Sequence, residues 1–323
     1  MPSNTIDCEP YPSRSLGFTI AFSSVLLLTG WSAAGTSLYS FDSAVLNRVD
    51  YQDEQVVTIN LSPGVPVPGG LANGRVGLAA DPLSGFVYSM QTTNVGGVLL
   101  RTDPNTGVVD YVGPGSFLSQ DPPLPVDPTS VWGLSFDPFS QSLYTINALP
   151  QSEVIKIDPL TGLGESLGVI DTGGAGSIDQ AKNLVVDPTT GIAYVMIPSS
   201  SLTELHLWTL DPSTMVATKG PEVVLPDNGA QHFDDMKFDP ITGELVGSLV
   251  DNFNFEAGLF TIDLVTGDTS RVDAYLPDWL SSGVADSGFG SFDLISTIPE
   301  PNSVGLAVLA ATTTLVLRRR SAA

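Results

Sequence analysis

The stretches Asp158-Pro159-Leu160-Thr161-Gly162 and Asp239-Pro240-Ile241-Thr242-Gly243 decide the fold of this chain. Each begins with an aspartate that caps a turn by accepting backbone N–H groups, and the proline fixes φ at the next position. The closing glycine takes the left-handed conformation. Apolar or alternating runs lie on both sides of each stretch, so each predicts a short connection between two strands of a β-hairpin.

The aspartate that opens this turn recurs in two interleaved series. Its spacings are 56, 50 and 52 residues in the first series and 55, 53 and 52 in the second. A fixed period indicates a repeat architecture, and four short strands in each repeat are typical of a β-propeller blade. The first series is Asp81, Asp137, Asp187 and Asp239, and the second is Asp103, Asp158, Asp211 and Asp263, which Leu264 follows in place of proline.

Both ends of the repeat region contain parts of one further blade. Residues 38–40 and 45–50 have the pattern of a second and a third strand, and residues 290–293 have that of a first strand. Asp50 lies 53 residues before Asp103, and Asp293 lies 54 residues after Asp239, in phase with the series. We therefore predict an all-β, five-bladed β-propeller over residues 36–296, with four whole blades and one composite blade that closes the ring. A two-sheet β-sandwich is the alternative, but it does not predict equal spacing in two series.

These repeats resemble YVTN-type and quinoprotein-dehydrogenase-like propeller repeats. The segments Leu143-Tyr144-Thr145-Ile146-Asn147 and Val154-Ile155-Lys156-Ile157-Asp158 show the likeness, which covers roughly residues 36–296. The resemblance implies the propeller fold. It implies no activity, because one fold serves many functions.

The composition of the chain excludes several classes of protein. The 323 residues include 35 acidic and 12 basic side chains, a formal net charge of −23. A nucleic-acid partner is therefore excluded, since phosphate binding needs Lys and Arg gathered on one face. A single cysteine excludes a disulfide framework and a four-cysteine zinc site. The 32 glycines and 25 prolines favour an all-β chain with many turns.

The N-terminal residues have the parts of a secretory signal peptide. Arg14 precedes an apolar run from Leu16 to Trp31, and the small residues Ser32 to Ala34 follow it. This order predicts a signal helix within residues 1–34, export by the Sec machinery and cleavage after Ala34. An uncleaved N-terminal membrane anchor is the alternative.

Residues 298–323 have three parts in a fixed order. The Pro299-Glu300-Pro301 tripeptide comes first, an apolar stretch from Ser303 to Leu317 follows, and the cluster Arg318-Arg319-Arg320 comes last. A helix of this length falls short of the roughly 30 Å hydrocarbon core of a bilayer. The arginines should keep to the cytoplasmic side, so the sequence predicts a short transmembrane helix that is membrane-bound before processing.

This order resembles the PEP-CTERM sorting signal of exported bacterial proteins. Pro299, Glu300 and Pro301 match the motif, and Arg318, Arg319 and Arg320 match the basic cluster. The resemblance implies recognition by an exosortase near the motif and a final location in the cell envelope or outside the cell. A plain C-terminal tail anchor is the alternative.

The strands that enter the predicted central channel supply the candidate site. A metal or acid–base centre needs carboxylates, His or Asn that are gathered around the channel. His232, Asp234 and Asp235 form such a cluster, and Lys182 and Asn183 come from the neighbouring blade. A Lys182–Asp234 ion pair at the channel mouth, with His232 on a loop, is the favoured alternative. The candidates are Trp132, Lys182, Asn183, His232, Asp234 and Asp235.

Two functional hypotheses follow. The first is an exported, non-catalytic propeller that binds an extracellular polysaccharide or an envelope protein through its variable loops. The second is a secreted, metal-dependent propeller enzyme of the lactonase or lyase kind, with a site near His232, Asp234 and Asp235. We favour the first and predict no cofactor. The turn aspartates could bind Ca²⁺, but each is isolated in sequence, so turn capping is the better interpretation.

Overall fold

The computed structural model describes the chain in segments that together span residues 35–297. All 21 strands lie within a compact unit that runs from Ser32 to Glu300. The described residues are 35–42, 45–50, 55–63, 75–93, 96–112, 131–147, 151–175, 181–199, 204–225, 233, 235–250, 257–272 and 292–297. The predicted signal helix and the predicted C-terminal helix lie outside them.

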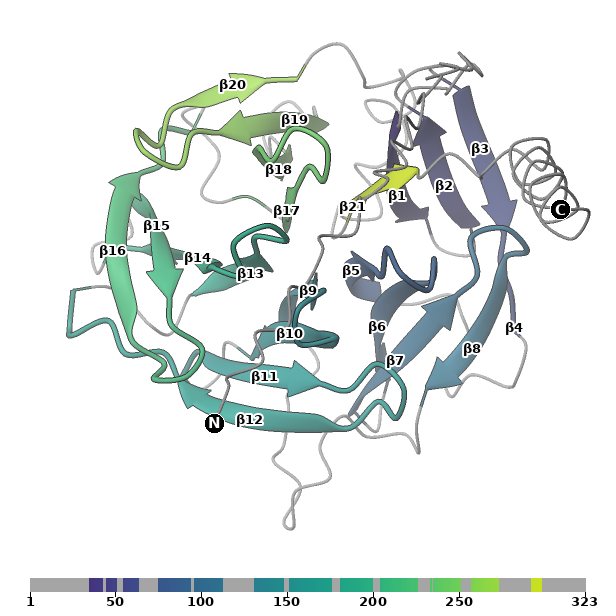
Figure 1. Cartoon of the computed structure of the whole chain (residues 1–323), viewed down its shortest axis with the longest axis horizontal. Coiled ribbons are helices and arrows are strands. Elements are labelled where there is room, and N and C mark those ends of the chain that lie inside the picture. Colours follow the sequence, from purple (N-terminus) through teal and green to yellow (C-terminus); the bar gives the residue numbers. More distant parts are fainter. Residues whose placement is uncertain are drawn as a thin grey trace, which may run out of the picture. The chain divides into compact units, whose positions relative to one another are not determined.

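The described strands form five sheets of the same design, each a meander of four antiparallel strands (Figure 1). Sheet 1 contains β21 (Phe292–Thr297), β1 (Gly35–Asp42), β2 (Val45–Asp50) and β3 (Gln55–Asn60). Sheet 2 contains β5 (Arg75–Ala80), β6 (Val87–Thr93), β7 (Gly96–Thr102) and β8 (Val108–Val112), and β4 (Ser62–Pro63) pairs with β8 in parallel.

The remaining three sheets repeat this order without additions. Sheet 3 contains β9 (Val131–Asp137), β10 (Ser142–Asn147), β11 (Glu153–Ile157) and β12 (Gly164–Val169). Sheet 4 contains β13 (Lys182–Val186), β14 (Ala193–Pro198), β15 (Leu205–Leu210) and β16 (Ala217–Glu222). Sheet 5 contains β17 (Asp235–Phe238), β18 (Leu245–Val250), β19 (Ala257–Ile262) and β20 (Thr269–Arg271).

The first strands of the sheets contact one another in sequence. Strand β5 contacts β9, β9 contacts β13, β13 contacts β17, and β21 contacts both β17 and β5. Repeated four-stranded meanders whose first strands meet in this way define a β-propeller, so the predicted all-β propeller fold is confirmed. Strand β21 pairs with β1 over six residue pairs, so the last strand of the domain completes the sheet of the first strands.

The predicted phase of that last strand is wrong. We expected Asp293 at the end of a first strand, in line with Asp81, Asp137, Asp187 and Asp239. Instead β21 begins at Phe292, so Asp293 is the second residue of the strand and pairs with Tyr39 in the middle of β1. The closing strand has no Asp-Pro turn after it, because the next strand of its sheet comes from the other end of the chain. Its register is therefore set by pairing with β1 and not by a turn.

The recurring aspartates cap their turns as the sequence predicts. The carboxylate of Asp158 accepts the N–H of Leu160 at 2.8 Å, and the Asp158 carbonyl accepts the N–H of Gly162 at 2.8 Å. Six of the other seven described turns repeat both bonds, and five of those six close on a glycine with positive φ. The Asp137 turn has Gln141 in the place of the glycine, with φ of 53°. Met215 takes that place in the turn between β15 and β16, with φ of 59°. Its left-handed backbone costs a non-glycine residue about 1–2 kcal/mol.

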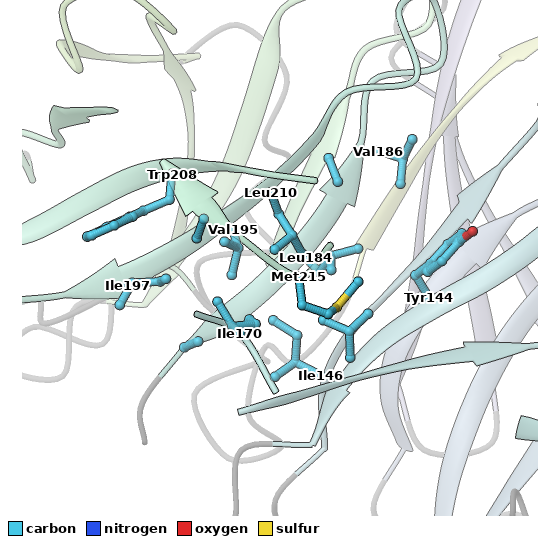
Figure 2. Close-up of a cluster of buried hydrophobic side chains, with 14 residues drawn as sticks. Tyr144, Ile146, Ile170, Leu184, Val186, Val195, Ile197, Trp208, Leu210 and Met215 are labelled. Carbon is cyan, nitrogen blue, oxygen red and sulfur yellow. The ribbon is translucent and has the colours of Figure 1, made fainter. Parts of the chain in front are cut away.

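Apolar side chains pack between neighbouring sheets, so the core is divided among the gaps between them. On sheet 4, Leu184 and Trp208 belong to one buried apolar cluster with Tyr144 and Ile146 of sheet 3 (Figure 2). Their chain neighbours Val185 and Leu207 belong to the cluster shared with sheet 5. Successive side chains of a strand point to opposite faces, so both faces of sheet 4 are buried. This explains why these strands are apolar runs and not alternating ones.

Described connecting segments tie sheet 1 to sheet 2 and sheet 4 to sheet 5 on the outer side. The N–H of Ser62, after sheet 1, donates to the carbonyl of Gly107 in sheet 2 at 3.0 Å. The N–H of Val224, after sheet 4, donates to the carbonyl of Gly267 in sheet 5 at 3.0 Å. A Cβ on Gly267 would lie 1.9 Å from the carbonyl oxygen of Glu222, so glycine is required there for contact as well as for conformation.

Gly267→Ala should therefore destabilise the protein more than Gly243→Ala. Both glycines close turns with similar positive φ, 77° and 73°, but a Cβ on Gly243 would meet nothing within 4 Å. We expect a loss of about 1 kcal/mol for Gly243→Ala from the backbone alone. For Gly267→Ala we expect about 2 kcal/mol more, because the connecting segment must shift. Chemical denaturation of both variants measures the difference, and equal losses would show that the close contact is unimportant.

Candidate functional site

Of the six candidate site residues, the structure describes the side chains of Lys182, Asn183 and Asp235. Trp132 lies on β9, and its side chain is outside the described part. Lys182 and Asn183 begin β13, and Asp235 begins β17. His232 and Asp234 lie outside the described residues, so the predicted metal centre and the Lys182–Asp234 pair both stay predictions.

Asn183 holds a backbone position that glycine occupies in the two preceding sheets. Gly77, Gly133 and Asn183 all have positive φ, at 68°, 64° and 54°. Each lies where the pairing of the first strand with the second shifts register. A Cβ on Gly77 would lie 2.6 Å from Cβ of Leu134, and one on Gly133 would lie 3.3 Å from Cα of Asn183. These positions therefore form the close contacts by which one first strand meets the next.

The side chain of Asn183 extends this contact to sheet 5. It is 1 % exposed, and its Nδ2 donates to the carbonyl of Phe233 at 2.5 Å. Phe233 is fully buried, and a Cβ on Gly247 would lie 2.5 Å from its ring, so the segment before β17 is held from two sides. Asn183 thus joins neighbouring sheets. Its Oδ1 is buried and has no hydrogen-bond partner among the described residues.

Asp235 forms a buried ion pair with Lys237 that the sequence reading missed. The Nζ of Lys237 lies 2.7 Å from Oδ1 of Asp235, and the two side chains are 4 % and 1 % exposed. The same carboxylate oxygen accepts the N–H of Met236 at 2.8 Å. Residues two apart on a strand share a face, so the pair is local to β17. The candidate residues of the sequence analysis do not include Lys237. The sequence does contain a sign of this pair, because a lysine occupies the position at which sheets 2 to 4 have Ala79, Ser135 and Val185.

The position of Lys237 faces the next sheet in the series wherever its contacts are described. In sheet 3 the equivalent Ser135 accepts the N–H of Val186 on β13 at 3.1 Å. In sheet 4 the equivalent Val185 packs in the cluster shared with sheet 5. By this equivalence a buried charge pair stands at the first strand of sheet 5, where the other sheets use small or apolar side chains.

The turn carboxylates accept hydrogen bonds from within their own turns. The N–H of Asn105 holds the pKa of Asp103 below its ordinary value. Burial raises the pKa of Asp187, but hydrogen bonds from Thr190 and Thr189 outweigh it, and the net shift is downward. These aspartates therefore stay ionised while their oxygens are used within the turn. No group of three or more acidic, His or Cys residues gathers in the described segments as metal ligands would, and the Ca²⁺ expectation stays untested.

No helix within the described segments is long and apolar enough to cross a membrane. No family model matches the chain, and no curated protein sequence matches it.

Among solved structures the chain is similar to several propellers at low identity. One is a chain of the nidogen/laminin complex, with 12 % identity, 80 % of this chain and 98 % of that chain covered, and a TM-score of 0.49. TolB from Acinetobacter baumannii has 11 % identity, 74 % and 52 % coverage and a TM-score of 0.44, so this chain spans about half of it. Oligogalacturonate lyase in complex with manganese has 13 % identity, 73 % and 61 % coverage and a TM-score of 0.40. These likenesses are too distant to assign an activity.

Lys237→Met should strongly destabilise the protein. It removes the ammonium group that lies 2.7 Å from the buried Asp235 carboxylate, a loss of about 3–5 kcal/mol. Asp235→Asn in the Lys237→Met background should restore most of that loss, because an amide oxygen still accepts the Met236 N–H without a charge. Lys219→Met, at an exposed position, is the control and should change stability by less than about 0.5 kcal/mol. Denaturant unfolding measures all three, and equal stability of Lys237→Met and Lys219→Met would show that the pair is unimportant.

Proposed function

We propose that this chain is an exported, five-bladed β-propeller that acts as a non-catalytic binding or structural protein of the cell envelope. Five sheets whose first strands contact one another in a closed series support the number of blades. The two series of turn aspartates support it independently, since they count four whole repeats before the ends of the domain are considered.

The burial and the contacts of Asn183 and Asp235 are the observation that supports a non-catalytic role. Both side chains were candidates for a catalytic centre, and both are 1 % exposed. Asn183 donates to Phe233, and Asp235 is paired with Lys237. A general acid, base or metal ligand must reach the substrate or the metal with a free lone pair or proton. Both side chains are buried, and the Asn183 amide nitrogen and the Asp235 carboxylate already make contacts within the fold. The names of the similar structures include a partner-bound protein and a lyase, so they do not separate the two hypotheses.

The two ends of the sequence support the proposed location. Export by the Sec machinery would remove residues 1–34 after Ala34, and an exosortase would process the chain near Pro299-Glu300-Pro301. Until then the apolar stretch from Ser303 to Leu317, with Arg318 to Arg320 behind it, would hold the propeller at the membrane. The remaining domain, residues 35–298, has 32 acidic and eight basic side chains, which suits a soluble surface outside the cytoplasm. Its ligand would be an extracellular polysaccharide or an envelope protein.

Deletion of residues 298–323 should abolish membrane association of the exported protein. Cell fractionation followed by immunodetection measures the change. Glu300→Ala with Pro301→Ala keeps the helix and the arginines, so this variant should stay in the membrane as an unprocessed, larger species. If this variant and the parent are both unprocessed and both stay in the membrane, the segment is a plain tail anchor. Unchanged membrane association after the deletion would exclude both possibilities.

Melting curves of the full-length protein should coincide in EDTA, Ca²⁺ and Mn²⁺. A ligand that binds the native state raises its melting temperature, whereas the proposed protein has no resident metal to lose or gain. A rise with either cation that His232→Ala or Asp234→Ala removes would contradict the proposal. Such a result would support the metal-dependent enzyme.

A further inference from the structure

Large apolar side chains recur at one position of the aspartate turns and are exposed. In five of the eight described turns, the residue two places after the aspartate is aliphatic or aromatic. We call these five the apolar turn residues: Leu83 (72 % exposed), Phe139 (63 %), Leu160 (79 %), Ile241 (46 %) and Val265 (85 %). Single exposed apolar residues are ordinary, but five at equivalent places on one kind of turn form a pattern.

The turn itself does not need an apolar residue at this position. The residue contributes its backbone N–H, which donates to the aspartate Oδ1 at 2.8 Å from both Leu83 and Leu160. Ser213 makes the same bond at 2.8 Å, and Asn105 and Thr189 also fill the position. Polar side chains therefore satisfy the same geometry. The apolar ones have no structural duty that would explain their exposure to water, which costs hydrophobic free energy.

The apolar turn residues share one face of the domain. Every such turn joins the first strand to the second, or the third to the fourth, within an antiparallel meander, so all the turns lie at the same end of their sheets. Turns of neighbouring sheets also approach each other. A Cβ on Gly191, in the sheet 4 turn, would lie 3.6 Å from the ring of Phe139 in sheet 3. We call this end of the propeller the turn face.

The turn face is also anionic. Each turn begins with an aspartate, and Glu244 and Asp268 follow two of the turns. Hydrogen bonds from Thr266 and Val265 hold the pKa of Asp263 below its ordinary value, so this charge persists at neutral pH. Arg101, close to one turn, is paired with Asp110 at 2.9 Å and lies over the ring of Phe86. Apolar side chains are therefore interspersed with negative charge.

We propose that the turn face is a docking surface for a protein that presents apolar side chains ringed by Lys and Arg. Charge complementarity selects this partner. An anionic lipid surface would be repelled, and a second copy of this chain would bring like charges together. The turn face lies at the opposite end of the sheets from the connections between second and third strands. The variable, ligand-binding loops are predicted at that opposite end, so the turn face adds a second interaction site to the proposed function.

The test uses full-length protein and a fluorescent amphipathic helical peptide of Leu and Lys as the probe. The triple variant carries Leu83→Ser, Leu160→Ser and Val265→Ser and keeps every charge. Serine already occupies this turn position in the protein, at Ser213. We expect its affinity for the peptide to fall at least about tenfold, with an unchanged melting temperature. The matched control is Val57→Ser with Val169→Ser, which removes exposed apolar residues away from the turns and should bind like the parent.

Three results would overturn the proposal. The first is equal peptide affinity of the triple variant and the parent, or an equal loss in the control. The second is equal binding of a Leu and Glu peptide, or insensitivity to salt, because either would exclude a cationic partner. The third concerns the occupant. Concentration-dependent dimers of the parent, or its binding to phosphatidylglycerol vesicles, that the triple variant abolishes would assign the face to a second copy or to lipid.

Discussion

Burial of both faces of each sheet is the constraint on which the structure depends. Neighbouring residues of sheet 4, such as Leu184 and Val185, enter different apolar clusters shared with different sheets. A sheet of this kind cannot bury its surface alone and needs a neighbour on either side. A closed series satisfies that need for every sheet at once. Pairing of β21 with β1 is therefore the step that lets the first and last sheets avoid a free apolar face.

Close backbone contacts reinforce the apolar packing at two places, between the first strands of the sheets and along their outer strands. Near the first strands, Gly77 and Gly133 let one strand rest on the next. On the outer side, connecting segments rest on Gly107 and Gly267. Glycines at these places serve a packing role beyond the turn, whereas Gly85 and Gly243 close turns in open space. A glycine in the same turn motif thus contributes more to stability where a neighbouring segment is in contact with it.

Polar side chains in the interior make contacts within the fold itself. Asn183 reaches from β13 to the segment before β17, and Asp235 neutralises Lys237 on β17. A buried ion pair stabilises little in itself, but each partner needs the other, so the pair specifies a single arrangement of this strand. The outside of the molecule has a different character. Turns that are equivalent in backbone differ in side chain, and this difference makes the turn face available for recognition.

Periodicity in the sequence was sufficient to predict the propeller, because each Asp-Pro turn is a local structure whose hydrogen bonds close within five residues. The spacing of such turns then counts the repeats without knowledge of their contacts. The phase of β21 was mispredicted, since its partner β1 lies more than two hundred residues away in the chain and no local turn sets its register. The Asp235–Lys237 pair and the roles of Asn183 and Gly267 were likewise decided by tertiary structure alone. Burial of a side chain and close approach of a backbone depend on which sheet lies alongside. A sequence pattern of turns and strands contains no information about the distance between neighbouring sheets.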